Sequence, residues 1–410
     1  MSTQPHASFR DIFRQPRSVF AVAFACVIAF MGIGLVDPIL PAIASSLDAT
    51  ATEAELLFTS YLLVTGLAML VTSWISSRIG AKRTLLIGLA IIVVFAAAAG
   101  LSQDVEQVIG FRAGWGLGNA LFISTALATI VGSASGGTAS AIMLYEAALG
   151  LGIAVGPLLG GLLGSWSWRG PFFGTATLMA VGFVAILALL RKDDAPRAPM
   201  RLSASLRALR TPARAVLAAA ALFYNIGFFV LLAYTPFPLG FDAIGLGLTF
   251  FGWGVGLAIT SVLVAPLLTR RMARTSVLRL VLPLLAADLA AAGLVVRSSV
   301  GLVVCVIVGG LLLGVLNTVL TECVMEATDH PRSVASSAYS SVRFLGGAIA
   351  PPAATELANL FSDATPYYAA AGSVLVALVI VVAGHRWLRR VDEAPVDALE
   401  EAQAVTAGDA

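Results

Sequence analysis

The chain has 410 residues, of which 59% are hydrophobic, and it carries 25 basic and 23 acidic side chains. Its mean hydropathy is +0.93, and its charged fraction of 12% is about half that of an ordinary soluble domain. These values exclude a water-soluble globular protein. The net charge of +2 is too small, and the basic residues are too scattered, for a surface that neutralises the phosphates of nucleic acid.

Twelve apolar runs have the length of a membrane-spanning helix. A hydrocarbon core of roughly 30 Å needs about 20 apolar residues per helix, and 410 residues leave about 34 for each of twelve spans with its loop. The first six runs cover residues 18–44, 54–76, 83–101, 105–131, 138–164 and 171–190. The last six cover residues 215–239, 245–268, 276–296, 299–327, 333–360 and 366–388. Asp37 and two prolines interrupt the long first run, so we expect a membrane helix there and no removable targeting segment.

A polar stretch separates these spans into two sets of six. We expect an N-terminal six-helix bundle over residues 1–190, a linker over 191–214 and a C-terminal six-helix bundle over 215–391. The linker is either a plain connection or contains a short amphipathic helix. The acidic residues 392–410 lack aromatic side chains, which is typical of a disordered tail. The expected fold class is an all-α integral membrane protein with two pseudo-symmetric bundles.

The basic residues indicate the orientation of the chain in the membrane. All of the 25 lysines and arginines fall on one side except Arg112, Arg169, Arg297 and Arg343. Since positively charged loops stay in the cytoplasm, we expect both termini to be cytoplasmic, in a multi-pass protein of a bacterial cytoplasmic membrane.

An internal repeat supports the division into two halves. Residues 145–161 can be laid over residues 339–355, which pairs Pro157 with Pro351. More weakly, Asn119 in the fourth span corresponds to Asn317 in the tenth. Two parallel six-helix repeats around a central path are typical of one large class of secondary transporters.

The cysteines and histidines of the sequence do not form the pattern of a disulfide or a metal site. Cys26, Cys305 and Cys323 lie inside apolar runs, and the three histidines are far apart in the chain. No Cys-x-x-Cys pair or Cys/His cluster occurs, so we expect neither disulfides nor a zinc site. We therefore expect a protein that is not an enzyme and needs no metal and no cofactor.

Small residues form a distinctive pattern in the fifth span. The residues of this pattern are Gly152, Gly156, Pro157, Gly160 and Gly161. They resemble the GxxxGPxxGG antiporter motif of the major facilitator superfamily, specifically of its twelve-helix drug:proton antiporter branch. Small residues let a neighbouring helix approach closely, and the proline removes one helical hydrogen bond. Generic packing of small residues is the alternative interpretation.

The same resemblance points to residues that couple transport to protons. The segment that begins with Arg112 is similar to the family's RxxxGxG segment, whose arginine is associated with proton transfer. Asp37, in a family-like pattern of two prolines, lies about 11 Å deep, as Arg112 does, so the two side chains are able to pair. Glu146, just before the glycine pattern, is the second candidate proton carrier, because an intramembrane charge is costly and normally functional. A purely structural ion pair is the alternative.

The loop between the second and third spans resembles the family's gating loop in part. Arg78, Gly80, Lys82 and Arg83 match the pattern. Ser73 and Ser77 stand where the family has a glycine and an aspartate, which puts the charge latch of that loop in doubt. Ordinary positive-inside charge explains the same basic residues.

Aromatic, amide and charged side chains inside the spans are candidates for a substrate cavity. They are Phe30, Tyr61, Trp115, Asn119, Tyr145, Tyr224, Asn225, Phe228, Asn317, Glu322 and Arg343. A mostly apolar pocket with a few hydrogen-bonding groups suits amphipathic organic molecules. Each aromatic residue is equally open to a packing role or to contact with lipid. Arg343 is a candidate partner for Glu322 or for substrate.

These features predict a proton-coupled exporter of small amphipathic or lipophilic compounds, which works as a monomer by alternating access of two halves. Its expected partners are a small-molecule substrate, protons and the lipid bilayer, without nucleic acid. A narrow exporter or importer of a metabolite, sugar, siderophore or lipid is the alternative. A membrane-embedded enzyme or sensor is a third class, for which no catalytic cluster is present.

Overall fold

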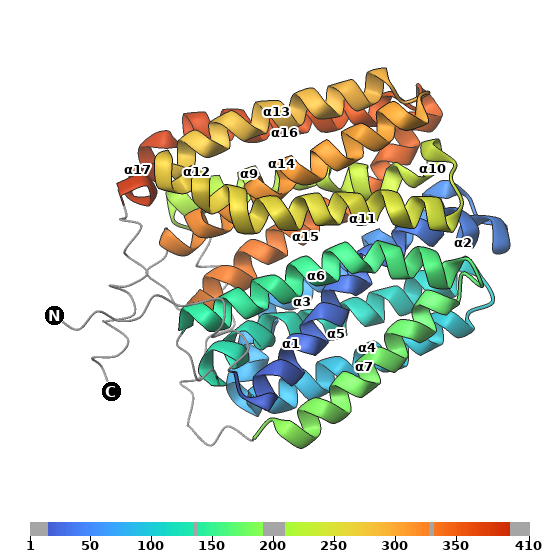
Figure 1. The fold of residues 1–410 in the computed structure, drawn as a ribbon, viewed down its shortest axis with the longest axis vertical. Coiled ribbons are helices and arrows are strands. Elements are labelled where there is room, and N and C mark those ends of the chain that lie inside the picture. The colour runs from blue at the N-terminus through green and yellow to red at the C-terminus, as the bar shows by residue number, and fades with distance from the viewer. Residues whose placement is uncertain (1–14, 134–137, 192–209, 328–331, 394–410) are drawn as a thin grey trace.

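The computed structural model describes residues 15–133, 138–191, 210–327 and 332–393 (Figure 1). Every regular element in these residues is helical. The expected all-α architecture is therefore confirmed for the part of the chain that the structure describes.

Helices coincide with all six predicted spans of the first half. Their bounds are α1 (Arg17–Gly34), the 3₁₀ turn η2 (Asp37–Ile39), α2 (Leu40–Ser46), α3 (Ala51–Ile79), α4 (Ala81–Leu101), α5 (Val105–Ser133), α6 (Thr138–Gly164) and α7 (Gly170–Leu189). The first predicted span is thus broken into three elements, because Pro38 and Pro41 interrupt the hydrogen-bond ladder of a single helix.

Helices likewise coincide with the six predicted spans of the second half. Their bounds are α9 (Pro212–Phe229), η3 (Val230–Tyr234), α10 (Pro236–Leu239), α11 (Ala243–Ile259), η4 (Thr260–Val264), α12 (Ala265–Arg271), α13 (Arg274–Leu294), α14 (Ser299–Glu326), α15 (Arg332–Leu360), α16 (Thr365–Ala383) and α17 (His385–Glu393). The elements η3 and η4 are π-helical turns, which place local bulges within two of the spans.

Several helix boundaries differ from the predicted ones by a few residues. Helix α9 already begins at Pro212, where a proline at the first helical position fits its fixed φ angle. In the last predicted span, 366–388, helix α16 ends at Ala383, and a separate short helix, α17, extends into the predicted tail as far as Glu393. Most of the predicted linker and tail lies outside the described residues.

Nine helices in the described residues are long and apolar enough to cross a membrane, by length and composition. The helical segments Ala148–Gly164 and Ala243–Ile259 are apolar but shorter. Helix α15 has 29 residues and interior prolines at Pro351 and Pro352. This set is consistent with the twelve predicted spans.

Each half packs around its own interior, and the halves meet along two helix pairs. In the first half α4 lies against α5 and α7, and α1 against α6 and α7. In the second half α13 lies against α14 and α16, and α9 against α15 and α16. The halves meet where α3 packs on α15 and α6 packs on α11, which run side by side through the middle of Figure 1.

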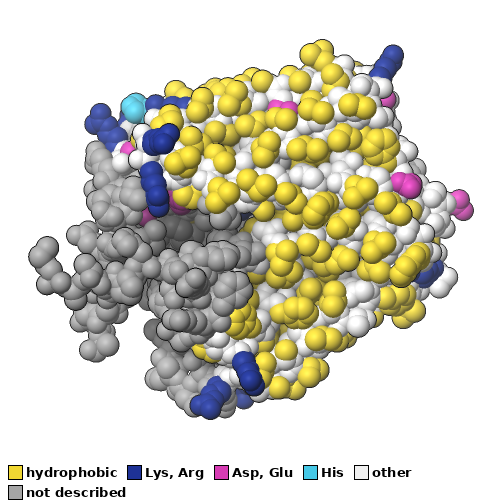
Figure 2. Space-filling model, viewed as in Figure 1, with side chains coloured by type: hydrophobic (Ala, Val, Ile, Leu, Met, Phe, Trp, Pro, Cys, Tyr) yellow, Lys and Arg dark blue, Asp and Glu magenta, His cyan; other side chains and the backbone are white. Residues whose placement is uncertain are grey.

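On the face shown in Figure 2, most charged side chains lie toward the two ends of the molecule, and hydrophobic side chains cover much of the flank between them. We call the end that carries Arg78, Lys82, Arg210 and Arg270 the basic end. We call the end that carries Ser46 and the residues around it the opposite end. The apolar flank is the surface that a helical membrane protein presents to lipid.

Candidate functional site

A buried arginine organises the interior of the first half. Arg112 on α5 is fully buried. Its guanidinium lies 4.2 Å from the ring centre of Tyr61 and 4.6 Å from that of Trp115, and its Nη1 donates a hydrogen bond to the Gly32 carbonyl. Asn119, one further buried residue on α5, donates to the Tyr61 hydroxyl at 2.5 Å. We call Tyr61, Arg112, Trp115 and Asn119 the N-half cluster.

Close helix packing holds the N-half cluster in place. The Thr65 hydroxyl donates to the carbonyls of Tyr61 and Gly116, which ties α3 to α5. A Cβ atom added at Gly116 would come within 2.8 Å of the Thr65 hydroxyl, and one added at Gly32 within 2.8 Å of the Trp115 ring. Both glycines are therefore required by close approach rather than by backbone conformation.

A second arginine organises a comparable group in the other half. The Asn317 side-chain oxygen on α14 accepts hydrogen bonds from the Tyr224 hydroxyl at 2.5 Å and from Arg343 Nη2 at 2.9 Å. Arg343, on α15, also lies 5.5 Å from the ring centre of Tyr339. We call Tyr224, Asn317, Tyr339 and Arg343 the C-half cluster. Arg343 and Asn317 are partly exposed, whereas Tyr224 and Tyr339 are buried.

The remaining predicted cavity residues do not all join these two clusters. Phe30 and Tyr145 contact each other edge to face at 5.7 Å. Phe228 packs on Trp253, with ring centres 5.2 Å apart. Asn225 donates its amide hydrogen to a carbonyl of its own helix, that of Ala221, so its amide group is used locally.

The glycine pattern of α6 contacts two different helices. Gly152, Gly156 and Gly160 face α1, where a Cβ atom at Gly156 would come within 2.7 Å of the Met31 carbonyl. Gly161 and the Pro157 carbonyl instead face α11, and a Cβ at Gly247 would come within 2.8 Å of that carbonyl. One stripe therefore binds α6 within its half, while the other forms part of the contact between the halves.

Polar contacts join α3 to α15 at the opposite end. The Thr59 hydroxyl donates to the Ala348 carbonyl at 2.6 Å, and Thr52 donates to Glu356 at 3.2 Å. Gly66, near the middle of α3, lies against the Ser341 carbonyl. From the opposite end to mid-helix, the two halves are thus closed on each other.

The sequence analysis missed Glu55 on α3. This carboxyl group is fully buried between the halves and accepts a hydrogen bond from Thr355 of α15 at 2.5 Å. A sequence signal was present, because Glu55, Phe58 and Leu62 share one face of α3 by the helical period of three to four residues. Glu55 is the second residue of the predicted span 54–76, a position where a carboxylate is expected to be solvated at the end of the helix.

The predicted gating loop is a tight connection at the basic end. Gly80 has φ +88° and lets α4 start directly after α3. Lys82 donates to the carbonyls of Leu187 and Leu190 at the end of α7, where a cation complements the helix dipole. Arg78 stacks on Trp74 at 4.4 Å, and Arg83 is exposed.

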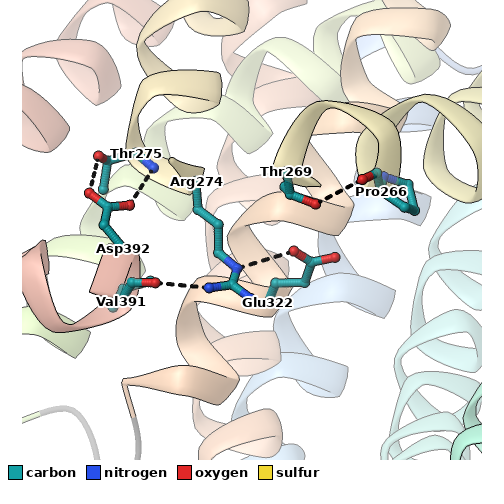
Figure 3. A network of polar contacts seen from close by, with 7 residues as sticks. All are labelled: Pro266, Thr269, Arg274, Thr275, Glu322, Val391 and Asp392. Carbon is teal, nitrogen blue, oxygen red and sulfur yellow. Dashed lines mark hydrogen bonds and ion pairs between the residues drawn. The ribbon is translucent and has the colours of Figure 1, made fainter. Parts of the chain in front are cut away.

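Glu322 takes part in a polar network at the basic end of the second half (Figure 3). Its carboxylate forms an ion pair with Arg274 at 3.4 Å, and the same arginine donates to the Val391 carbonyl on α17. Asp392 accepts hydrogen bonds from the backbone and hydroxyl of Thr275, and its carboxylate thereby caps the N-terminus of α13. In this network the ion-pair partner of Glu322 is Arg274.

The side chains of Asp37 and Glu146 lie outside the described residues. The backbone places Asp37 in the turn η2, and Glu146 in α6 one turn and a half before Gly152. Their role in proton coupling stays a prediction.

A solved structure of similar shape is that of the human organic anion transporter MFSD10 (TETRAN). It matches with a TM-score of 0.69 and 17% identity, over 89% of this chain and 99% of that one. The D-xylose-proton symporter matches with a TM-score of 0.72 and 12% identity, over 89% of this chain and 96% of that one. At such identities these likenesses show the fold alone.

Proteins related in sequence indicate the family of this chain more specifically than the structures of similar shape do. The multidrug efflux protein YfmO of Bacillus subtilis is 52% identical over 92% of this chain and 95% of its own length. The tetracenomycin C resistance and export protein of Streptomyces glaucescens is 30% identical over 48% of this chain and 39% of its own length. The family model described as Major Facilitator Superfamily matches residues 22–351, most of the chain. With the two-bundle fold and the glycine pattern of α6, this match shows that the chain belongs to the Major Facilitator Superfamily of membrane transporters.

Proposed function

We propose that the protein is a proton-coupled exporter of small amphipathic or lipophilic compounds, driven by the proton gradient and active as a monomer without a cofactor. It moves its substrate and changes no covalent bond. The observation that carries the proposal is the fully buried Arg112, stacked on Tyr61 and Trp115 inside a membrane-spanning bundle. A buried intramembrane charge is costly and is retained where it serves transport.

The relatives support export in particular. YfmO is named a multidrug efflux protein, and the partial relative from Streptomyces glaucescens is named for resistance and export. Gly161 of α6 and Gly247 of α11 supply close packing on which the halves pivot. One proton that crosses one pH unit and about 100 mV supplies about 3.7 kcal/mol, which supports roughly a 500-fold gradient of a neutral substrate.

The orientation follows from the charges. We assign the basic end to the cytoplasm, in a bacterial cytoplasmic membrane with both termini inside. The contacts of α3 with α15 then lie toward the extracellular side, and we infer that this side is closed.

The test is substrate-evoked proton movement in liposomes. The reconstituted protein is placed under an imposed proton gradient, lumenal pH is recorded, and lipophilic cations and neutral drugs are added in turn. We expect at least one compound to evoke proton flux, and we expect Asp37→Asn or Glu146→Gln to abolish it. Glu106→Gln, which alters an exposed carboxylate at the opposite end, is the matched control and should leave the flux unchanged.

Two results would overturn the proposal. If no lipophilic compound evokes flux, while a metabolite, sugar, siderophore or lipid does, the protein is a narrow transporter. If proton and substrate move in the same direction, it is an importer.

A further inference from the structure

The carboxyl group of Glu55 lies in the contact between the two halves, where α3 packs on α15. It is fully buried, although it lies only four residues from the start of α3 at the opposite end. Its Oε2 accepts the hydrogen bond from Thr355, which belongs to the other half. Its Oε1 is also buried and has no hydrogen-bond partner among the residues that the structure describes. The side chain is therefore sealed in the contact between the halves.

The surroundings of Glu55 favour a neutral carboxyl group. Among the described residues it forms no ion pair, and Thr355 is its hydrogen-bond donor. A charged carboxylate in such a place loses its hydration without a cation to compensate, which is strongly unfavourable. Protonation removes that cost without altering the packing.

No described basic residue forms an ion pair with Glu55, and Arg169, a basic residue at the same end, stacks on Trp168 and donates to the Gly100 carbonyl. The other ionisable groups of the opposite end include Glu53 on α3, Glu356 on α15, Asp363 in the turn after α15, Asp48 after α2, Glu106 on α5 and Tyr234 on η3. Arg112 on α5 stacks on Tyr61, six residues or about 9 Å further along α3. The Tyr234 hydroxyl on η3 donates to the Asp363 carbonyl.

We propose that Glu55 is a proton-binding site that latches the opposite end of the transporter: the proton bound there closes the two halves, and its loss opens them. When the halves separate, water reaches the carboxyl group, the proton leaves to water, and the carboxylate is hydrated. When a proton returns from water, the neutral group is able to re-enter the contact with Thr355. This inference rests on the proposed alternating access and specifies which group links it to protons at the extracellular side.

The latch fits the direction of export. After substrate has left an open extracellular side, acid outside protonates Glu55 and favours closure, which returns the protein to the state that faces the cytoplasm. The open and closed states bind the proton at different pH values. Between those two values, the ratio of closed to open molecules changes by up to about tenfold per pH unit.

The experiment measures the distance across the opposite end as a function of pH. Spin labels are attached to Ser46→Cys in the first half and Asn359→Cys in the second, both at exposed positions. The native cysteines Cys26, Cys305 and Cys323 are buried and give little background labelling. Distances are recorded by pulsed electron spin resonance between pH 5 and pH 9, without substrate and without a gradient.

We expect a short distance between the two spin labels at low pH. As pH rises, the fraction of molecules with a longer distance should grow at least fivefold. Glu55→Gln, which keeps the shape of the neutral carboxyl group, should hold the short distance at every pH. Thr355→Val removes the partner hydroxyl and should enlarge the open share at each pH. Glu356→Gln is the matched control, because this exposed carboxylate also bonds across the halves, to Thr52, and should retain the wild-type pH response.

The proposal is overturned if the wild-type distances ignore pH, or if Glu55→Gln opens with pH as the wild type does. Should Glu55→Gln not fold, the wild-type titration and Thr355→Val still decide the question. Failure of drug-evoked proton flux would refute the proposed export while the pH response stands, and a missing pH response would refute the latch while drug export stands.

Discussion

The N-half and C-half clusters contain the same kinds of residue in different surroundings. Each joins an arginine to an asparagine and a tyrosine, and the asparagines, Asn119 and Asn317, occupy corresponding helices of the repeat. Arg112 and Asn119 are fully buried, whereas Arg343 and Asn317 are partly exposed. We interpret the buried cluster as part of the coupling machinery, and the exposed cluster as the one that meets substrate. Pseudo-symmetry of sequence thus need not produce symmetry of function.

Replacing each arginine by alanine gives the largest effect and the sharpest contrast. Arg112→Ala removes the cation that stacks on Tyr61 and Trp115, so we expect drug-evoked proton flux to fall about 100-fold or more at any substrate concentration. Arg343→Ala should mainly raise the half-saturating substrate concentration, by about tenfold. Flux in liposomes over a range of concentrations separates the two. Equal effects on maximal rate would refute the contrast.

A methyl group beneath the N-half cluster should destabilise the fold. Gly116→Ala forces a Cβ against the Thr65 hydroxyl and the Tyr61 carbonyl, and overpacking of this kind costs about 1–3 kcal/mol. Thermal unfolding in detergent measures the loss as a lower Tm. Gly110→Ala is the control on the same helix, because its Cβ would meet nothing within 4 Å. Equal Tm values for the two variants would contradict the packing described for α3 and α5.

The two asparagines offer a finer comparison. Asn317→Ala leaves Tyr224 and Arg343 without their shared acceptor, and we expect a several-fold loss of substrate affinity with little change in Tm. Asn119→Ala leaves the buried Tyr61 hydroxyl without its amide donor, so it should lower Tm by a few degrees instead. Binding titrations and thermal unfolding of both variants test this. A reversal of the two patterns would exchange the assigned roles.

The smallest effect is expected at the basic end. Arg274→Gln breaks the ion pair with Glu322 and the bond to α17, yet both side chains keep some exposure, 12% and 33%. Such pairs are worth about 1 kcal/mol or less, and salt screens them. We therefore expect a Tm decrease of a few degrees at low salt and almost none in high salt, with transport retained. A large loss of transport would assign this network a gating role.

Much of the fold was predictable from the sequence. The lengths of the apolar runs predict where the helices lie, because a bilayer demands spans of a given length. The glycine pattern of α6 also predicts close helix contacts, and the structure shows them against Met31 and Gly247. What composition does not supply is the rotation of each helix about its axis, so the aromatic residues named for the cavity separate into different groups.

The site was less predictable for the same reason. The Asn225 amide bonds within its own helix, and Glu322 pairs with Arg274, because local donors and acceptors compete for polar side chains. The burial of Glu55 depends on the packing of α15 against α3, and its partner Thr355 is 300 residues away in the chain. Contacts between distant segments decide which intramembrane charge matters.

The most direct test of alternating access is a reversible crosslink across the opposite end. Thr52→Cys and Glu356→Cys replace two side chains that already contact each other between the halves, and a short thiol-specific crosslinker joins them. The account predicts that crosslinked protein in liposomes shows no substrate-evoked proton flux, and that cleaving the linker restores it. Undiminished flux through the crosslinked protein would contradict the claim that transport requires this end to open.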